Sequence, residues 1–84
     1  MSDDSVRATI TRLLGEIAPE ADFVTLDPAR PIRDQLDIDS MDFLNFVVAI
    51  HDELGVDIPE ADYGQVATLD ACTAYVSQRL PAAH

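Results

Sequence analysis

The chain has 84 residues, enough for one small domain with a thin core and too few for two domains. Its 16 acidic residues against 5 basic ones, all arginine, give a formal net charge of -11, which disfavours binding to nucleic acids and to anionic membrane surfaces. Because 48% of the residues are hydrophobic, the acidity does not imply disorder. We therefore expect a single folded domain over residues 1–84 that presents a group to basic protein partners rather than enclosing a catalytic cleft.

Cysteine content and targeting signals indicate the compartment. Cys72 is the only cysteine, so no intramolecular disulfide can form, which fits a reducing cytoplasm. No apolar run approaches the ~20 residues that span a bilayer, and the acidic N-terminus does not resemble a signal peptide. We expect a cytoplasmic protein that does not insert into membranes. Without long terminal extensions, we also expect it to be a discrete protein, and a monomer.

The first predicted helix runs from about Asp3 to Ala18. Its apolar residues recur every three to four positions and form one stripe, which consists of Val6, Ile10, Leu13, Leu14 and Ile17. Acidic residues at the start favour the positive end of the helix dipole, and Pro19 marks the end. A proline-rich loop over residues 19–39 follows. Its apolar side chains should pack it onto the helices, and its length indicates a function or a short helix within it.

The second predicted helix runs from Ser40 to Leu54 and stops at Gly55. Asp39 is its expected N-cap, and Asp42 at the third helical position completes a capping box. The apolar arc of this helix is wider than the roughly 100° stripe that a surface helix buries. One edge of the arc can face the core, and it consists of Phe43, Phe46, Val47, Ile50 and Leu54.

The other edge of the same arc contains Met41 and Val48, with Leu44 beside them. Two interpretations stay open. The helix could simply be the most enclosed member of the bundle. Alternatively, this edge could be exposed and form a docking surface with an apolar centre and a polar rim of Asp42, Asn45 and Asp52.

The remaining elements complete an all-α fold. Residues 56–59 read as an extended connector, and residues 60–66 have room for a short helical turn. The last helix is predicted from about Leu69 to Leu80, with Thr68 as N-cap. Its expected buried residues are Leu69, Cys72, Tyr75, Val76 and Leu80. We predict a small bundle of three main helices and one short helix.

The segment Asp39-Ser40-Met41 resembles the phosphopantetheine attachment motif of acyl carrier proteins, in which a serine opens the second helix between an acid and an aliphatic residue. The resemblance covers nearly the whole chain. Residues 53–59 (ELGVDIP) are similar to the end of that helix and its connector, and residues 68–71 (TLDA) to the start of the last helix. Independently, the free N–H groups and the dipole at a helix start favour a phosphate.

The resemblance implies a mechanism of carriage. Ser40 would hold a 4'-phosphopantetheine arm through a phosphodiester, with Asp39 and Met41 flanking it, and the arm's thiol would hold cargo as a thioester. A phosphopantetheinyl transferase would attach the arm. A loading ligase and downstream transferases or synthases would dock through basic patches on Met41, Asp42, Asn45, Val48 and Asp52.

Two departures from the family pattern concern the partners and the cargo. Relatives that serve fatty acid synthesis commonly carry acids at the positions of Asn45 and His51, so we expect partners from a specialised lipid or secondary-metabolite pathway. Phe43 and Phe46 stand where smaller side chains are common. If they face the core, they fill the space that lodges an acyl chain in related proteins, which predicts a short or polar cargo.

Other functions are also compatible with the sequence. An aminoacyl or peptidyl carrier, and an unmodified adaptor with the carrier fold, both stay open. We expect no catalysis, because His51 lies about 16 Å from Ser40 along the helix and no Gly-x-Ser-x-Gly elbow is present. We expect no metal site either, since the aspartates of residues 34–42 lack the spacing of an EF-hand loop.

Overall fold

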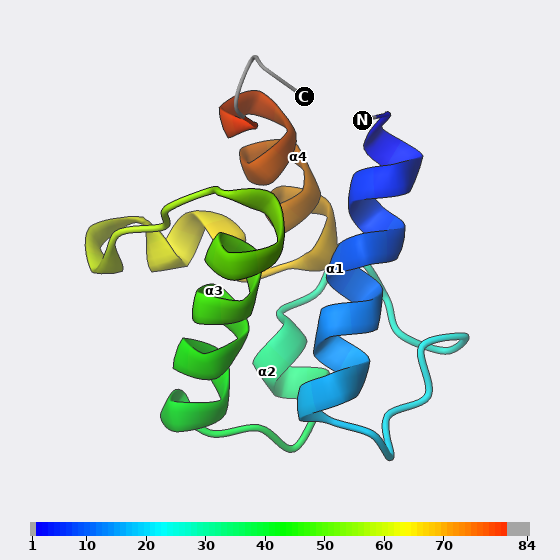
Figure 1. The fold of residues 1–84 in the computed structure, drawn as a ribbon. Coiled ribbons are helices and arrows are strands. Elements are labelled where there is room, and N and C mark those ends of the chain that lie inside the picture. Colours follow the sequence, from blue (N-terminus) through cyan, green and yellow to red (C-terminus); the bar gives the residue numbers. More distant parts are fainter. Residues whose placement is uncertain (1, 81–84) are drawn as a thin grey trace.

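The computed structural model describes residues 2–80, and their regular structure is helical. The elements are α1 (Asp3–Ile17), α2 (Ile32–Gln35), α3 (Ser40–Leu54), the 3₁₀ helix η1 (Glu60–Val66) and α4 (Leu69–Arg79). Figure 1 shows α1 and α3 side by side in opposite directions, with α2 between their lower halves. Helix α1 also packs against α4, and α4 packs against η1. The predicted all-α bundle is confirmed.

Local capping explains where the helices begin and end. The predicted N-caps Asp39 and Thr68 both accept a hydrogen bond from a backbone N–H of their own helix. Gly55 ends α3 with a positive φ of 72°, a conformation that costs glycine little. For α1 the cap is Ser2, which precedes the acidic first turn and accepts from the N–H of Ser5 at 3.2 Å.

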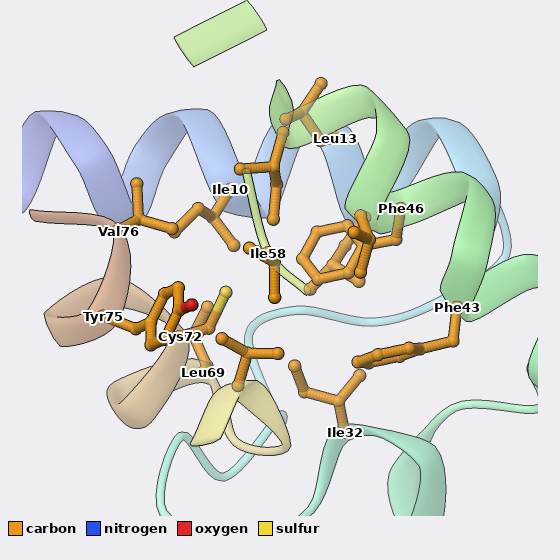
Figure 2. Packing of buried hydrophobic residues seen from close by; sticks show 14 of the residues in the cluster. Ile10, Leu13, Ile32, Phe43, Phe46, Ile58, Leu69, Cys72, Tyr75 and Val76 are labelled. Atoms are coloured by element: carbon orange, nitrogen blue, oxygen red, sulfur yellow. The ribbon is translucent and has the colours of Figure 1, made fainter. Parts of the chain in front are cut away.

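The core lies where α1, α3 and α4 meet, as Figure 2 shows. Every residue that we assigned to the core-facing edge of α3 is buried. In α1 the predicted stripe is buried except for Ile17, which packs against the core from its margin. Leu80, predicted as the last residue of the final helix, is instead the C-cap after α4, and it is likewise only partly buried. Thr73, which the sequence did not single out, is buried because its hydroxyl donates to the carbonyl of Leu69 at 2.8 Å.

The loop before α3 packs on the bundle and contains the predicted short helix, α2. Its buried side chains are Ile32, Leu36 and Ile38. The backbone also ties the loop to the start of α4, because Ile32 N–H donates to Ala67 at 2.8 Å and Asp70 N–H donates to Pro28 at 3.0 Å. These contacts determine where the chain enters α3.

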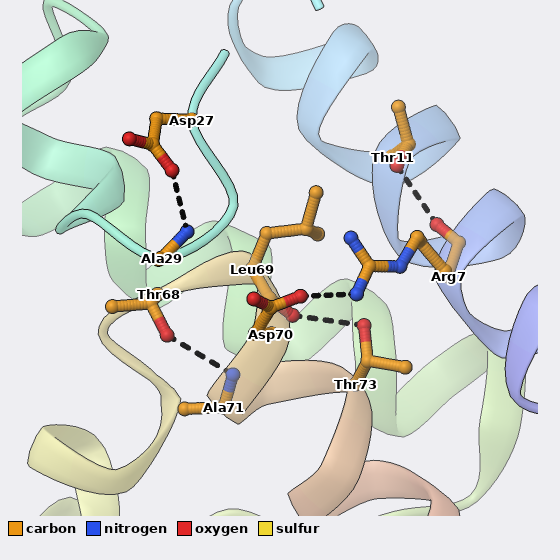
Figure 3. A network of polar contacts seen from close by, with 9 residues as sticks. All are labelled: Arg7, Thr11, Asp27, Ala29, Thr68, Leu69, Asp70, Ala71 and Thr73. Atoms are coloured by element: carbon orange, nitrogen blue, oxygen red, sulfur yellow. Dashed lines mark hydrogen bonds and ion pairs between the residues drawn. The ribbon is translucent and has the colours of Figure 1, made fainter.

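Two ion pairs connect α1 to its neighbours. Arg7 pairs with Asp70 at the start of α4, as Figure 3 shows, and Arg12 pairs with Glu53 near the end of α3. Both pairs are solvent-exposed, so each contributes little to stability, of order 0–1 kcal/mol. Within residues 2–80, none of the helices is long and apolar enough to cross a membrane.

Candidate functional site

Ser40 is the first residue of α3, and its side chain is exposed. The capping box around it is complete: Asp42 N–H donates to Asp39 Oδ1 at 2.9 Å, and Asp39 N–H donates to Asp42 Oδ2 at 3.2 Å. Both predicted carboxylates are thus engaged by backbone groups of the helix start. The N–H groups of Ser40 and Met41 find no acceptor within residues 2–80, as expected for a first helical turn.

An arginine adjoins the serine from the preceding helix. Arg33 Nη2 donates to Ser40 Oγ over 3.4 Å. The two residues are seven positions apart in the chain, and the loop between α2 and α3 brings them together. No sequence periodicity relates a residue of α2 to the start of α3, so the sequence alone does not indicate this role for Arg33.

The second edge of α3 is exposed, so enclosure of the helix does not explain its apolar arc. Met41, Leu44 and Val48 are 64%, 40% and 49% exposed. Around them, Asn45 and Asp52 are exposed and Asp42 is half-buried. We call the three apolar side chains the outer edge of α3. Leu44, expected beside Met41 and Val48, belongs to this edge.

A small pocket of about 260 Å³ lies between α2, α3 and η1. Its lining includes Arg33, Phe43 and Tyr63. The rings of Phe43 and Tyr63 meet edge to face with centroids 5.5 Å apart, and Phe43 meets Phe46 in the same way at 6.0 Å. Figure 2 shows both phenylalanines directed from α3 into the core. A larger open hollow of about 690 Å³ beside the end of α1 contains none of the predicted site residues.

Other reactive side chains lie away from Ser40. Cys72 is buried in the core, and this burial raises the pKa of its thiol to about 12. The Tyr75 hydroxyl donates a hydrogen bond to Asp62 Oδ2 at 2.6 Å. This bond is the main reason that the pKa of Tyr75 is raised, and desolvation adds to the increase. His51 is exposed in the last turn of α3, at the other end from Ser40. The structure therefore does not bring His51 to the serine.

Comparison with known proteins shows the family to which this chain belongs. Residues 4–76 match the family described as the phosphopantetheine attachment site. An acyl carrier protein from Acidothermus cellulolyticus (strain ATCC 43068 / DSM 8971 / 11B) is 25% identical over 79 residues, which cover 92% of this chain and 90% of the relative. A short helical bundle with an exposed serine at the start of a long helix is the architecture of a carrier protein. The chain belongs to the acyl carrier protein family, whose cofactor is phosphopantetheine.

The start of α3 fits this cofactor. The Ser40 hydroxyl is accessible, two backbone N–H groups beside it lack acceptors within the described residues, and the Arg33 guanidinium is in contact with the same oxygen. N–H groups and a cation are the partners that a phosphate prefers. As a carrier protein, the chain interacts with an enzyme that modifies it and with enzymes that use its cargo.

Proposed function

We propose that Ser40 is the residue that carries the phosphopantetheine arm and that the protein presents acyl intermediates on this arm to partner enzymes. The observation that carries the proposal is the exposed Ser40 hydroxyl at the first position of α3, within the Asp39-Ser40-Met41 motif. When bound, the arm supplies a terminal thiol that holds the cargo as a thioester. Residues 1–84 act in this proposal as one carrier domain that catalyses no reaction itself and works in the cytoplasm.

The chain's own residues have distinct roles in this proposal. The carboxylates of Asp39 and Asp42 hold the first turn of α3 in place through their capping hydrogen bonds, so the serine has a defined position. The N–H groups of Ser40 and Met41, which have no acceptor among the described residues, and the helix dipole favour the negative phosphate. A flexible arm then raises the effective concentration of cargo at a docked enzyme without new contacts by the protein.

The outer edge of α3 is the proposed docking surface. Its exposed apolar centre can be buried by a partner, and Asp42 and Asp52 at its rim favour a basic partner surface. The phosphopantetheinyl transferase, a loading ligase and downstream transferases or synthases would all use this surface in turn. Such docking should be fast and weak, since it depends on steering by charge. With Asn45 and His51 in place of acids, we propose partners from a specialised lipid or secondary-metabolite pathway.

The cargo is proposed to be short or polar and to remain outside the core. Phe46 is completely buried and Phe43 is 5% exposed, so both occupy volume at the centre of the bundle. Phe43 and Tyr63 both line the small pocket, and their edge-to-face contact forms part of its wall. A long acyl chain would have to displace packed aromatic rings, and displaced core packing costs on the order of 1–3 kcal/mol.

Intact mass tests the attachment site. The wild type, Ser40→Ala and Ser5→Ala are incubated with a broad-range phosphopantetheinyl transferase and coenzyme A. Ser5 is the matched control, because it is an exposed serine in the first turn of another helix. We expect a phosphopantetheine increment on the wild type and Ser5→Ala, and none on Ser40→Ala. A folded wild type that gains no increment would favour the adaptor.

Chemical shifts test the proposed cargo. A long acyl chain is loaded on the arm, and the methyl and aromatic signals of core residues are compared with those of the unloaded protein. We expect little change in the wild type. Phe43→Leu, which removes the ring that contacts Tyr63, is the companion variant and should admit the chain and shift core signals. Large shifts throughout the core of the wild type would refute the proposal.

A further inference from the structure

Arg33 differs from the arginines that have partners within the fold. Among residues 2–80, Arg7 and Arg12 pair with acids, and the Arg79 guanidinium lies 3.6 Å from the centroid of the Tyr75 ring. Arg33 has no acidic partner in this part of the chain. Its one polar side-chain contact there is with Ser40 Oγ. Arg30 also lacks an acidic partner among the described residues, so what distinguishes Arg33 is its contact with Ser40.

The backbone of Arg33 is held firmly. The preceding residue, Ile32, is completely buried, and its N–H donates to Ala67. The Leu36 N–H closes the turn on the carbonyl of Ile32 at 2.9 Å. Gln35 fixes the same turn from outside, since its amide donates to the carbonyl of Asp27 at 2.8 Å. The backbone of Arg33 therefore has a defined position, from which its guanidinium reaches the serine.

A nearby cation would stabilise a phosphate on Ser40. The phosphate would add a negative charge beside the carboxylates of Asp39 and Asp42, both of which lie in the same turn. Like charges this close repel each other, and the helix dipole offsets only part of the cost. The non-bridging oxygens of a phosphodiester are attached to phosphorus bonded to Ser40 Oγ, and the Arg33 guanidinium is already 3.4 Å from that Oγ. A guanidinium pairs with phosphate oxygens through two parallel N–H groups.

We propose that Arg33 binds the phosphodiester of the arm and so positions its first bonds against α2. This inference rests on the proposed attachment at Ser40 and adds to it a residue that distinguishes this chain's arm site. Arg33 acts here as a positioning residue. It compensates the charge of the phosphate, and it holds the root of the arm beside the pocket whose lining it shares with Phe43 and Tyr63.

The test compares apo and holo forms of the wild type, Arg33→Gln, Arg33→Lys and Arg30→Gln. Arg30 is the matched control, because it is an exposed arginine three positions before Arg33, in the loop that precedes α2, with no ion pair among the described residues. Intact mass first verifies complete modification of each protein. Two quantities are then measured: the ³¹P chemical shift of the phosphodiester at low and high salt, and the unfolding equilibrium constant in urea before and after the arm is attached.

We expect the ³¹P signal to shift in Arg33→Gln and to stay unchanged in Arg30→Gln, with high salt moving the wild type toward Arg33→Gln. Attachment of the arm should raise the unfolding equilibrium constant about two- to fivefold more in Arg33→Gln than in the wild type. Arg33→Lys should lie between them, because it keeps the charge and loses the planar fork.

Several outcomes would overturn the inference. Identical ³¹P shifts and identical apo-to-holo ratios in the wild type and Arg33→Gln would show that Arg33 does not contact the phosphate. Equal effects of Arg33→Gln and Arg30→Gln would mean that any loss of a positive charge has this effect, without a specific contact of Arg33. A wild type that gains no mass increment would instead refute attachment at Ser40, and this inference with it.

Discussion

The two edges of α3 have similar apolar composition and opposite surroundings. The inner edge packs Phe43, Phe46 and Ile50 against the other helices, whereas the outer edge leaves Met41, Leu44 and Val48 in contact with solvent. The inner edge satisfies the need of a small domain for a core. The apolar side chains of the outer edge do not contribute to the core, so folding does not explain why they are apolar. Helix α3 therefore combines a structural face and a face available for binding within a single stretch of sequence.

The largest expected difference between the two edges is in stability. Phe46→Ala removes a completely buried ring and leaves a cavity, which should lower the free energy of unfolding by about 3–5 kcal/mol. Val48→Ala, the corresponding truncation on the outer edge, should change it by less than about 0.5 kcal/mol. Urea denaturation followed by circular dichroism measures both. Similar losses in the two variants would mean that the outer edge is part of the core.

The second prediction compares the reactivity of the buried Cys72 thiol with that of the exposed thiol on the arm. Burial raises the pKa of Cys72 to about 12, so at pH 8 almost none of it is thiolate. An exposed thiol with an ordinary pKa should react faster by a factor on the order of a thousand. We expect no fast-reacting thiol in the folded apo protein and one in the holo protein, measured by a chromogenic disulfide reagent. A fast-reacting Cys72 in the apo form would contradict its place in the core.

The same thiol predicts how stability depends on alkaline pH. The pKa of Cys72 is raised from 9.0 in the unfolded chain to about 12 in the folded protein. The folded state therefore keeps a proton that the unfolded state loses, and stability falls as pH rises from 9 toward 12, by up to about 1.4 kcal/mol per pH unit. Denaturation at several pH values measures this slope, and Cys72→Ala should reduce it. An unchanged slope in that variant would assign it to other groups, such as Tyr75.

A smaller effect is expected when the outer edge loses its apolar character. Val48→Asp should weaken docking to the phosphopantetheinyl transferase about tenfold, seen in kcat/KM for arm attachment, because a charge replaces a side chain that the partner buries. Val24→Asp is the control: it makes the same change at a residue that is 94% exposed, in the loop that Figure 1 shows across α1 from α3. Equal effects of the two substitutions would refute a role for the outer edge.

The smallest effect concerns the turn where both edges begin. Asp39→Ala removes the acceptor for the Asp42 N–H and should cost about 1 kcal/mol of stability. Asp39→Asn keeps an acceptor oxygen and should cost less. Urea denaturation of the two variants separates the cap from the charge. An equal loss in both would mean that the negative charge of Asp39, rather than its hydrogen bond, stabilises this helix start.

Local signals in the sequence were enough to predict most of α3. Asp39 and Gly55 are a cap and a stop whose effects act within one turn, so the bounds of the helix could be predicted from neighbouring residues. Helical periodicity predicts the wide apolar arc and its two edges, whereas the exposure of the outer edge is known only from the structure. The start of the last helix was predicted correctly for the same reason, since Thr68 caps it.

Contacts between distant residues could not be predicted in this way. The proximity of Arg33 to Ser40 depends on how Ile32 docks on Ala67, and the contact of Phe43 with Tyr63 depends on where η1 packs. No repeating pattern in the sequence indicates either contact. Thr73 was missed because a polar side chain is buried only when a partner is present, here the carbonyl of Leu69.

The edge-to-face contact between Phe43 and Tyr63 has a kinetic consequence for a carrier. A cargo lodged in a core must be extracted before an enzyme can use it, and extraction adds a barrier to every delivery. If the rings keep the cargo outside the core, as proposed, no extraction step is needed. Delivery is then limited by the motion of the arm. The cargo of this proposal also stays exposed to solvent on the arm, so hydrolysis of the thioester competes with its transfer to a partner enzyme.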